Sequence, residues 1–297
     1  MLTVQSRLPS QALRPYVRAF AQRKADLPGA ALVEPVPARL EQTLEFQFGD
    51  LFDVNFSDGG KITSPPMTVV GWLDSLRAEV RLCGAVESFA IFFQPGGFSQ
   101  LFGVPINELR NQAFEAQSVL GPRVLSLQQR LGDSKGFFER VMVAESFLRG
   151  LLPAGAARDS EASAANRILS LRGMVGVDAL ARDARLSRRQ FERRFLAEVG
   201  ISPKAYARVA RFQTALDMKV VQPGRKWIDT ALDLGYFDQM HLVHDFKKLA
   251  GHSPERLLHI LGDMRPKALA ASGEIDRARK NVASAASSRV SGVGKKA

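Results

Sequence analysis

Cysteine and long apolar runs are scarce in this 297-residue sequence. Cys83 is the single cysteine, which excludes an intramolecular disulfide and a cysteine-based zinc site and is typical of a reducing compartment. No apolar run approaches the ~18 residues of a membrane span. The start, M-L-T-V-Q-S-R-L-P-S, lacks the charged segment and apolar run of a secretion signal. We therefore expect a soluble, cytoplasmic protein with no membrane partner.

Histidine is also missing from the first half, because the four histidines all lie in the second. The carboxylates Glu34, Glu41 and Glu45 are scattered and have no histidine or nucleophile beside them, so we expect no catalytic residues, no cofactor and no enzyme. His241 and His244 have a metal-like spacing on a helix. They lack a supporting carboxylate or cysteine, so we expect no metal site either.

What the sequence does have is a strongly asymmetric charge. Residues 1–160 carry 16 basic and 16 acidic side chains, which leaves 25 of the 41 basic and 14 of the 30 acidic groups for the second half. The whole net charge of +11 therefore lies after residue 160. This asymmetry predicts a neutral domain joined to one that meets a polyanion such as nucleic acid.

The first half is predicted to be rich in β-structure. Within residues 40–100, L-E-F-Q-F-G-D, F-D-V-N-F-S-D-G-G and V-E-S-F-A-I-F-F-Q-P-G-G are punctuated by Asp-Gly and Pro-Gly breaks, which is typical of strands. Residues 122–131 and 135–152 then have helical periodicity, and the second segment places Phe138 and Met142 one turn apart. We expect a pocket in the strands and an interface on the helices.

The domain boundaries follow from composition. The stretch P-A-G-A-A-R-D-S-E-A-S-A-A at residues 153–165 has the small residues of an exposed linker. We therefore predict an α+β protein with a β-rich, sensor-like domain at 1–152 and an all-α domain at 166–263. Residues 264–297 are rich in Ala, Ser, Gly, Lys and Arg, which predicts a disordered basic tail.

The second half contains an internal repeat, V-D-A-L-A-R-D-A-R-L-S-R-R-Q-F-E-R-R-F-L-A-E-V-G-I-S-P from Val177 and W-I-D-T-A-L-D-L-G-Y-F-D-Q-M-H-L-V-H-D-F-K-K-L-A-G-H-S-P from Trp227. The offset between the copies is 50 before the central turn and 51 after it. One extra residue therefore lies in the second turn, where insertions are tolerated.

Each copy has the pattern of a helix-turn-helix. A small residue (Ala181 or Ala231) allows two helices to approach closely, and a turn at Arg185 or Gly235 separates them. Ser187 and Asp238 are suitable N-caps for the second helices. The buried stripes are predicted to be Phe191 and Phe195 in one copy and Leu242 and Phe246 in the other, while Trp227, Tyr236 and Phe237 are interpreted as core.

Between the copies, Val209, Phe212, Leu216 and Val220 are spaced for one long helix. About 18 residues give roughly 27 Å, comparable with the ~34 Å between successive major-groove faces of DNA. The second helix of each copy can therefore reach its own major groove when a helix of this length connects the two copies.

Residues 165–260 resemble the DNA-binding domain of the AraC/XylS family of transcriptional regulators. A-L-D-L-G-Y-F-D-Q-M-H-L-V-H-D-F-K-K-L-A-G-H-S-P is similar to the family signature over its whole length, and S-R-R-Q-F-E-R-R-F with G-I-S-P-K-A-Y supports it. The resemblance implies two recognition helices in consecutive major grooves, preceded by an effector-sensing or dimerising domain. Two positions depart from the pattern, since Arg185 replaces a common Gly and His244 a common Arg.

The resemblance also implies the contact residues. Arg189, Glu192 and Arg193 match the base-facing positions of the first unit, and Gln239, Met240 and His244 match those of the second. Arginine suits this task because its guanidinium can meet guanine O6 and N7 together. Further DNA-contacting positions, as base or phosphate contacts or caps, are predicted at Ser187, Arg188, Arg194 and Asp238.

We therefore expect a transcription regulator, an activator by family, that binds double-stranded DNA under the control of an unknown small-molecule effector. RNA polymerase is a partner that the resemblance implies, and a homodimer is possible. Two alternatives stay open at this point. The first half could be a ligand-binding or catalytic domain that a basic domain tethers to nucleic acid, or the basic half could bind DNA without regard to sequence.

Overall fold

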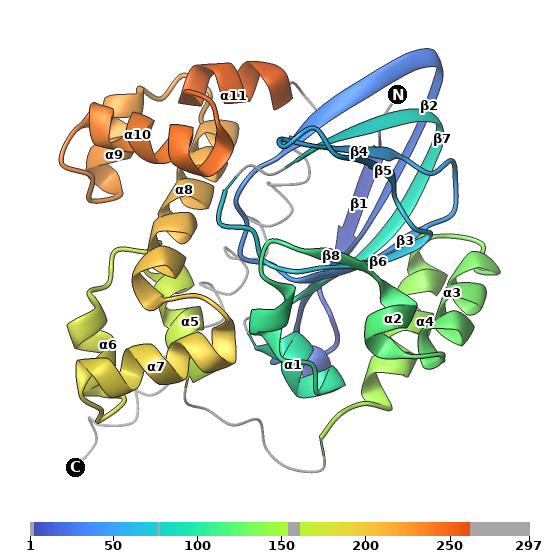
Figure 1. The fold of residues 1–297 in the computed structure, drawn as a ribbon, viewed down its shortest axis with the longest axis horizontal. Helices are drawn as coiled ribbons and strands as arrows, with labels where there is room; N and C mark the ends of the chain where they lie inside the picture. Colours follow the sequence, from blue (N-terminus) through green and yellow to red (C-terminus); the bar gives the residue numbers. More distant parts are fainter. Residues whose placement is uncertain (1–2, 76–77, 95, 154–160, 262–297) are drawn as a thin grey trace, which may run out of the picture.

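The computed structural model describes residues 3–75, 78–94, 96–153 and 161–261. A β-sheet covered by helices forms the N-terminal part, and an all-helical part that contains the repeat lies beside it (Figure 1). The predicted α+β architecture, with two helix-turn-helix units joined by a long helix, is confirmed.

Eight antiparallel strands run through the described residues in the order β1-β2-β7-β3-β6-β8, with β4 paired to β5 and β7. Their bounds are Thr3–Arg7 (β1), Val17–Val36 (β2), Thr43–Gln47 (β3), Asp53–Phe56 (β4), Lys61–Thr63 (β5), Met67–Val70 (β6), Ala78–Phe93 (β7) and Ala113–Glu115 (β8). The long strands β2 and β7 form the centre of this sheet, and β3 and β4 pair with successive parts of β7.

The predicted strands correspond to β3, β4 and the second half of β7, whereas the sequence analysis missed β2. Two prolines and a glycine interrupt the β2 sequence, which therefore has the composition of a turn. The sheet accommodates Pro28 and Gly29 by a register shift between Leu27 and Ala31, with Gly29 at a φ of 67°, whereas Pro35 stays paired opposite Glu79. Proline and glycine at a bulge keep the strand continuous on both sides.

Short helical segments cover one face of the sheet: η1 (Gln11–Leu13), α1 (Gly97–Phe102), η2 (Ile106–Leu109), α2 (Ala116–Leu120), α3 (Arg123–Gly132) and α4 (Phe137–Arg149). Helices α3 and α4 confirm the two helices predicted at the end of the first half. Leu44 and Phe46 of β3 pack with Val141 of α4 in this core. The outer surface of α4 carries Phe138 and Met142, which are 58% and 59% exposed.

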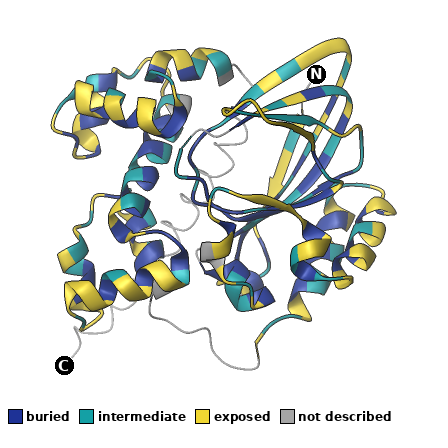
Figure 2. Cartoon of the chain, viewed as in Figure 1, coloured by how far each residue is buried: buried dark blue, intermediate teal, exposed yellow. Residues whose placement is uncertain are grey.

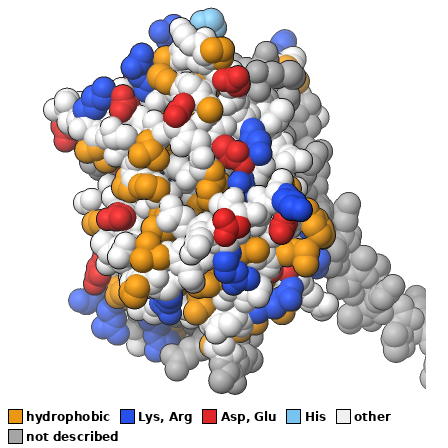
Figure 3. All heavy atoms as spheres, turned by 90° about the vertical axis from the view of Figure 1, so that its right-hand side faces the viewer, with side chains coloured by type: hydrophobic (Ala, Val, Ile, Leu, Met, Phe, Trp, Pro, Cys, Tyr) orange, Lys and Arg blue, Asp and Glu red, His pale blue; other side chains and the backbone are white. Residues whose placement is uncertain are grey.

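Figure 3 shows the side of the molecule formed by this N-terminal part. Acidic, basic and apolar side chains are interspersed over it, without a large area of one charge. The surface therefore agrees with the absence of net charge in the first 160 residues.

The second half consists of α5 (Glu161–Ser170), α6 (Val177–Asp183), α7 (Arg188–Val199), α8 (Pro203–Val221), α9 (Trp227–Asp233), α10 (Gln239–Ala250) and α11 (Pro254–Leu261). The predicted linker at 153–165 is wrong at its end, because residues 161–165 belong to α5 and Ala164 and Ala165 are buried. Small apolar side chains suit a helix as well as a linker. The predicted tail at 264–297 lies outside the described residues.

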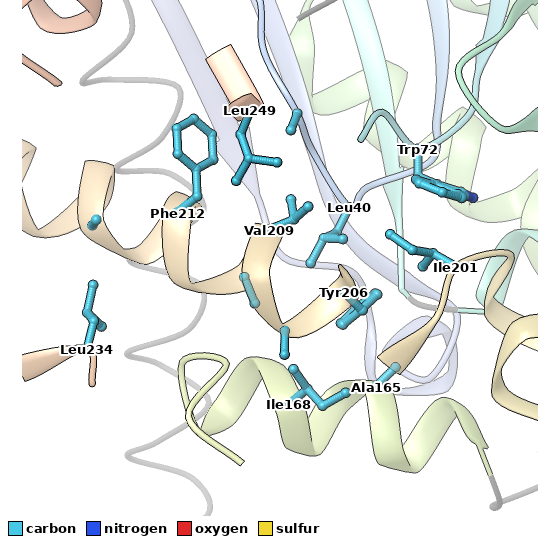
Figure 4. Packing of buried hydrophobic residues seen from close by; sticks show 14 of the residues in the cluster. Leu40, Trp72, Ala165, Ile168, Ile201, Tyr206, Val209, Phe212, Leu234 and Leu249 are labelled. Atoms are coloured by element: carbon cyan, nitrogen blue, oxygen red, sulfur yellow. The ribbon is translucent and has the colours of Figure 1, made fainter. Parts of the chain in front are cut away.

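One hydrophobic core joins the helical part to the sheet. Leu40 and Trp72 of the N-terminal part pack in the same cluster as Ile201, Tyr206 and Val209 (Figure 4). Burial is concentrated along this contact and inside each helical unit, whereas the outer surfaces of α7 and α10 carry exposed side chains (Figure 2). Helices α7 and α10 therefore pack through their inner faces and leave their outer faces exposed.

Candidate nucleic-acid interface

The first helix-turn-helix unit consists of α6 and α7. Its turn passes through Arg185, whose φ of 54° is left-handed, and the Leu186 amide donates to the Ala181 carbonyl oxygen at 3.0 Å. Ser187 then caps α7: its hydroxyl accepts from the Gln190 amide at 3.3 Å, and the Gln190 side chain accepts from the Ser187 amide at 3.1 Å. This reciprocal capping box fixes the start of α7.

The second unit consists of α9 and α10 and repeats the turn and N-cap hydrogen bonds of the first, without the reciprocal bond of the capping box. Gly235 is left-handed with a φ of 69°, and the Tyr236 amide donates to the Ala231 carbonyl oxygen at 3.0 Å. Asp238 accepts from the His241 amide at 2.7 Å and so caps α10. The predicted equivalence of Arg185 with Gly235, and of Ser187 with Asp238, is thereby confirmed.

Helix α8 connects the units and contributes to both cores. It starts at the predicted Ser-Pro cap, where the Ser202 hydroxyl accepts from the Ala205 amide at 3.3 Å. Tyr206 makes an edge contact with Phe195 of α7 at 5.6 Å between ring centroids, and Phe212 makes one with Phe246 of α10 at 4.8 Å. Its 19 residues span about 28 Å. The two units are therefore parts of one packed body.

The outward face of α7 is basic and accessible. Arg189, Arg193 and Arg194 are exposed, and none has an ion-pair partner among the described residues. The structure places Arg188 and Glu192 differently from these three, because the Arg188 Nε donates to Glu192 at 3.1 Å. That hydrogen bond, with the charge of Asp178, raises the pKa of Arg188. Arg188 and Glu192 thus satisfy each other at the surface, as weakly held exposed pairs do.

The outward face of α10 differs in chemistry. Met240 and His244 are exposed at the positions that Arg189 and Arg193 occupy on α7, and Gln239 is half-buried in the first turn. The interpretation of Trp227 and Tyr236 as core is confirmed, since both are buried. For Phe237 it is wrong, because this side chain is 88% exposed.

Tyr236 fixes the second turn from below. Burial, and then the charge of Asp245, raise the pKa of Tyr236 well above its ordinary value. The Arg211 guanidinium of α8 lies 5.0 Å from the centre of the Tyr236 ring, while the His241 ring makes an edge contact with it at 5.1 Å. Arg211 therefore packs against the second unit.

Contacts with the N-terminal part hold the helical part at several places. The Ala38 amide donates to the Leu249 carbonyl oxygen at the end of α10 at 2.9 Å, and the Gln213 Nε2 of α8 donates to Glu41 at 3.0 Å. Helix α7 also lies close to η2. No sequence signal indicated Ala38 or Gln213, because these contacts join segments that are far apart along the chain.

Two of the three carboxylates considered for catalysis, Glu34 and Glu41, are engaged in ion pairs. Glu41, 8% exposed, pairs with the buried Arg18, and Glu34 pairs with Arg23 at 3.0 Å. Burial opposes the ionisation of Glu41, but Arg18 and the Gln213 hydrogen bond outweigh it, so the pKa of Glu41 lies below its ordinary value. These groups are charged and paired, which is typical of a structural role.

The described residues also lack two other kinds of feature. None of the helices there combines the length and apolar character needed to cross a membrane. Within the same residues, no group of three or more His, Cys, Asp or Glu side chains gathers where a metal ion could be held.

Comparison with known proteins gives a family match for each half. Residues 180–259 match a family described as a helix-turn-helix domain, and residues 5–115 match a domain of unknown function (DUF6597). No curated protein matches the chain. The helix-turn-helix match covers both units described above, from α6 to α11.

Among solved structures, ToxT from Vibrio cholerae is similar at 7% identity and a TM-score of 0.46, covering 88% of this chain and 98% of that one. ToxT from strain SCE256 with bound unsaturated fatty acid has 9% identity and a TM-score of 0.44, covering 86% and 95%. The AraC-like transcriptional activator CuxR has 12% identity and a TM-score of 0.25, covering 71% and 86%.

Proposed function

We propose that this chain is a member of the AraC/XylS family of transcriptional regulators, which its helix-turn-helix domain supports, and that it reads a bipartite DNA site with both units. In this proposal α7 and α10 enter successive major grooves on one face of the duplex. The bound site is then two unlike blocks about one helical turn apart, since the two outward faces differ.

The observation that carries this proposal is that α8 connects two helix-turn-helix units, and that in each unit the capped second helix, α7 or α10, has an accessible outward face. The length of α8, about 28 Å, is compatible with the ~34 Å groove spacing because the recognition helices extend sideways from it. Arg189 and Arg193 supply the cationic forks suited to guanine. The remaining predicted contacts, at Ser187, Arg188, Glu192, Arg194, Asp238, Gln239, Met240 and His244, occupy the first turns and outward faces of the two helices.

Arg188 and Glu192 take a secondary role in this proposal. Their mutual hydrogen bond is exposed and can be exchanged for a phosphate contact by Arg188 at little energetic cost. Base reading then falls mainly to Arg189 and Arg193, while Arg188 and Arg194 position the helix on the backbone.

We further propose that the N-terminal domain takes a small-molecule effector on the sheet face opposite its helices. Leu44 and Phe46 point into the helix-covered core, so the alternate residues Thr43 and Gln47 face the other side. The Thr43 Oγ1 and Gln47 Nε2 atoms are buried and have no hydrogen-bond partner among the described residues. Unpaired buried groups cost about 1–3 kcal/mol each, so a ligand that bonds to them gains affinity.

Selection of randomised duplexes by the full chain, at near-physiological salt, tests the DNA proposal. Enrichment of two blocks about one helical turn apart is expected. Equal recovery of all sequences would instead support a sequence-blind basic domain.

Effector binding has a separate test. Thermal shift of the full chain against a set of polar small molecules should give a stabilising compound, and Gln47→Leu should abolish its effect. A stabilising compound that acts equally on Gln47→Leu would remove this sheet face from the proposal. RNA polymerase contact and homodimer formation stay predictions from the family resemblance.

A further inference from the structure

Phe237 is the extra residue of the second unit. The hydrogen bonds Leu186 to Ala181 and Tyr236 to Ala231 mark equivalent points in the two turns. In the first unit the N-cap follows at once at Ser187, whereas in the second Phe237 stands between Tyr236 and the N-cap Asp238. The repeat therefore has no position in its core for this aromatic ring.

The ring lies at the front of the second recognition helix. Phe237 is 88% exposed and Met240 is 68% exposed, more than the other large hydrophobic side chains that the structure describes. Met240, His244 and Lys247 follow at spacings of four and three on the outward side of α10. We call Phe237, Met240, His244 and Lys247 the α10 front.

The surroundings of the α10 front fit an anionic partner. The carboxylates nearest to it along the chain are engaged, because Asp238 accepts from the His241 amide and Asp245 is buried beside Tyr236. The exposed charges that α10 itself carries are Lys247 and Lys248. Helix α10 thus has exposed apolar side chains at its start and exposed lysines near its end. This combination is complementary to a groove that is lined by phosphates and presents apolar groups.

In the major groove the C5-methyl of thymine is the apolar group that a base edge presents. We propose that Phe237 and Met240 pack against thymine methyl groups, so that the second unit reads its block by apolar contact while the first reads its block through arginine. This inference rests on the proposed function and adds a thymine-reading role for Phe237. The flexible thioether of Met240 can adjust to the position of the methyl group.

The test replaces thymine by uracil, which removes only the methyl group. The duplex obtained by selection is made with uracil in one block at a time, and its affinity for the full chain is compared with that of the thymine duplex. We expect about a three- to fivefold loss for each methyl that α10 contacts, and none in the block read by α7.

Variants then assign the effect to side chains. Phe237→Ala and Met240→Ala should bring the thymine-to-uracil affinity ratio close to one. Phe138→Ala, an aromatic residue that is 58% exposed on α4, should leave the ratio unchanged. Phe237 is so exposed that its removal leaves the fold intact.

The outcomes separate this inference from the proposed function. A two-block site whose affinity does not respond to uracil overturns thymine reading and leaves bipartite recognition standing. If Phe237→Ala leaves the thymine-to-uracil affinity ratio unchanged, Phe237 does not read thymine, whatever other effect the substitution has. Selection without any enriched site overturns both.

Discussion

Arg193 illustrates that the outward residues of α7 do not contribute to the core of the fold. It is exposed on α7 between the buried Phe191 and Phe195, so its side chain can change without altering the core. Mutation at such a position reports on binding alone. Comparison among several DNA sequences then shows whether the guanidinium meets a base or a phosphate.

Arg193→Ala is expected to weaken binding to the selected site by about 1–3 kcal/mol and to relax the preference at one base pair. Equilibrium binding to single-substituted duplexes at fixed salt measures both effects. Arg194→Ala, next to it, is the control and should weaken all duplexes by a similar factor. Uniform weakening by Arg193→Ala would remove this residue from the base readers.

Arg185 carries a backbone strain that Gly235 avoids. Both are left-handed, but only glycine adopts this conformation without a steric penalty, which for other residues is of order 1 kcal/mol. Arg185→Gly should therefore raise the free energy of unfolding, by roughly 0.5 kcal/mol once the greater freedom of glycine in the unfolded chain is subtracted. Urea denaturation measures the change. Gly235→Ala is the reciprocal control and should lower it.

At the scale of elements, the capping box decides where α7 begins. Ser187 and Gln190 bond reciprocally at the first turn, which also carries Arg189. Ser187→Ala should lower the free energy of unfolding by about 1 kcal/mol. Ser187→Asp restores a cap, so it should retain stability in thermal denaturation while its negative charge weakens DNA binding. Weak DNA binding by the alanine variant alone would indicate that helix fraying, rather than charge, controls affinity.

Sequence periodicity predicted the elements whose stability is local. The capped helices, the buried Phe191 and Phe246 and the left-handed turns follow from residues close together in the chain. The bulged strand β2 was missed because prolines and a glycine obscure its pattern. Phe237 was misassigned because an inserted residue does not share the environment of its neighbours.

Contacts between the halves follow a different logic. Ala38 bonds through its backbone to Leu249, and Gln213 reaches Glu41 across the boundary between the sheet and α8. A backbone amide leaves no trace in residue type, and a single glutamine on a helix has no distinctive pattern. Only the three-dimensional arrangement brings these groups together.

For the whole molecule, Gln213→Leu removes one side-chain hydrogen bond between the halves and leaves Arg18 and Glu41 paired. We expect a loss of about 1 kcal/mol in the free energy of unfolding. Hydrogen exchange should show the greatest loss of protection in α8 and residues 38–42. Gln222→Leu, at the exposed end of α8, is the control and should leave this protection unchanged.

Glu41→Gln removes the carboxylate that pairs with the buried guanidinium of Arg18, which should lower the free energy of unfolding by about 3–5 kcal/mol at neutral pH. Because the folded pKa of Glu41 is lowered, its contribution is complete above the ordinary value of 4.5 and is lost as the pH falls through the folded pKa. The difference between wild type and variant should therefore shrink in acid. Denaturant titrations at pH 7 and below pH 4 measure it, and a constant difference would show that the pair does not titrate with folding.

The repeated unit also has a consequence for how such a protein can acquire new targets. Caps, turns and buried rings occupy one set of positions in both copies, while the outward positions hold arginine in one copy and methionine, histidine and an inserted phenylalanine in the other. The two copies therefore provide two recognition helices whose outward residues can change independently, while the same buried residues support both. Transferring the outward residues of α7 to α10 would change the preferred DNA site from two unlike blocks to two like blocks. The outward residues of one helix can also change while the other helix keeps the protein on its original site.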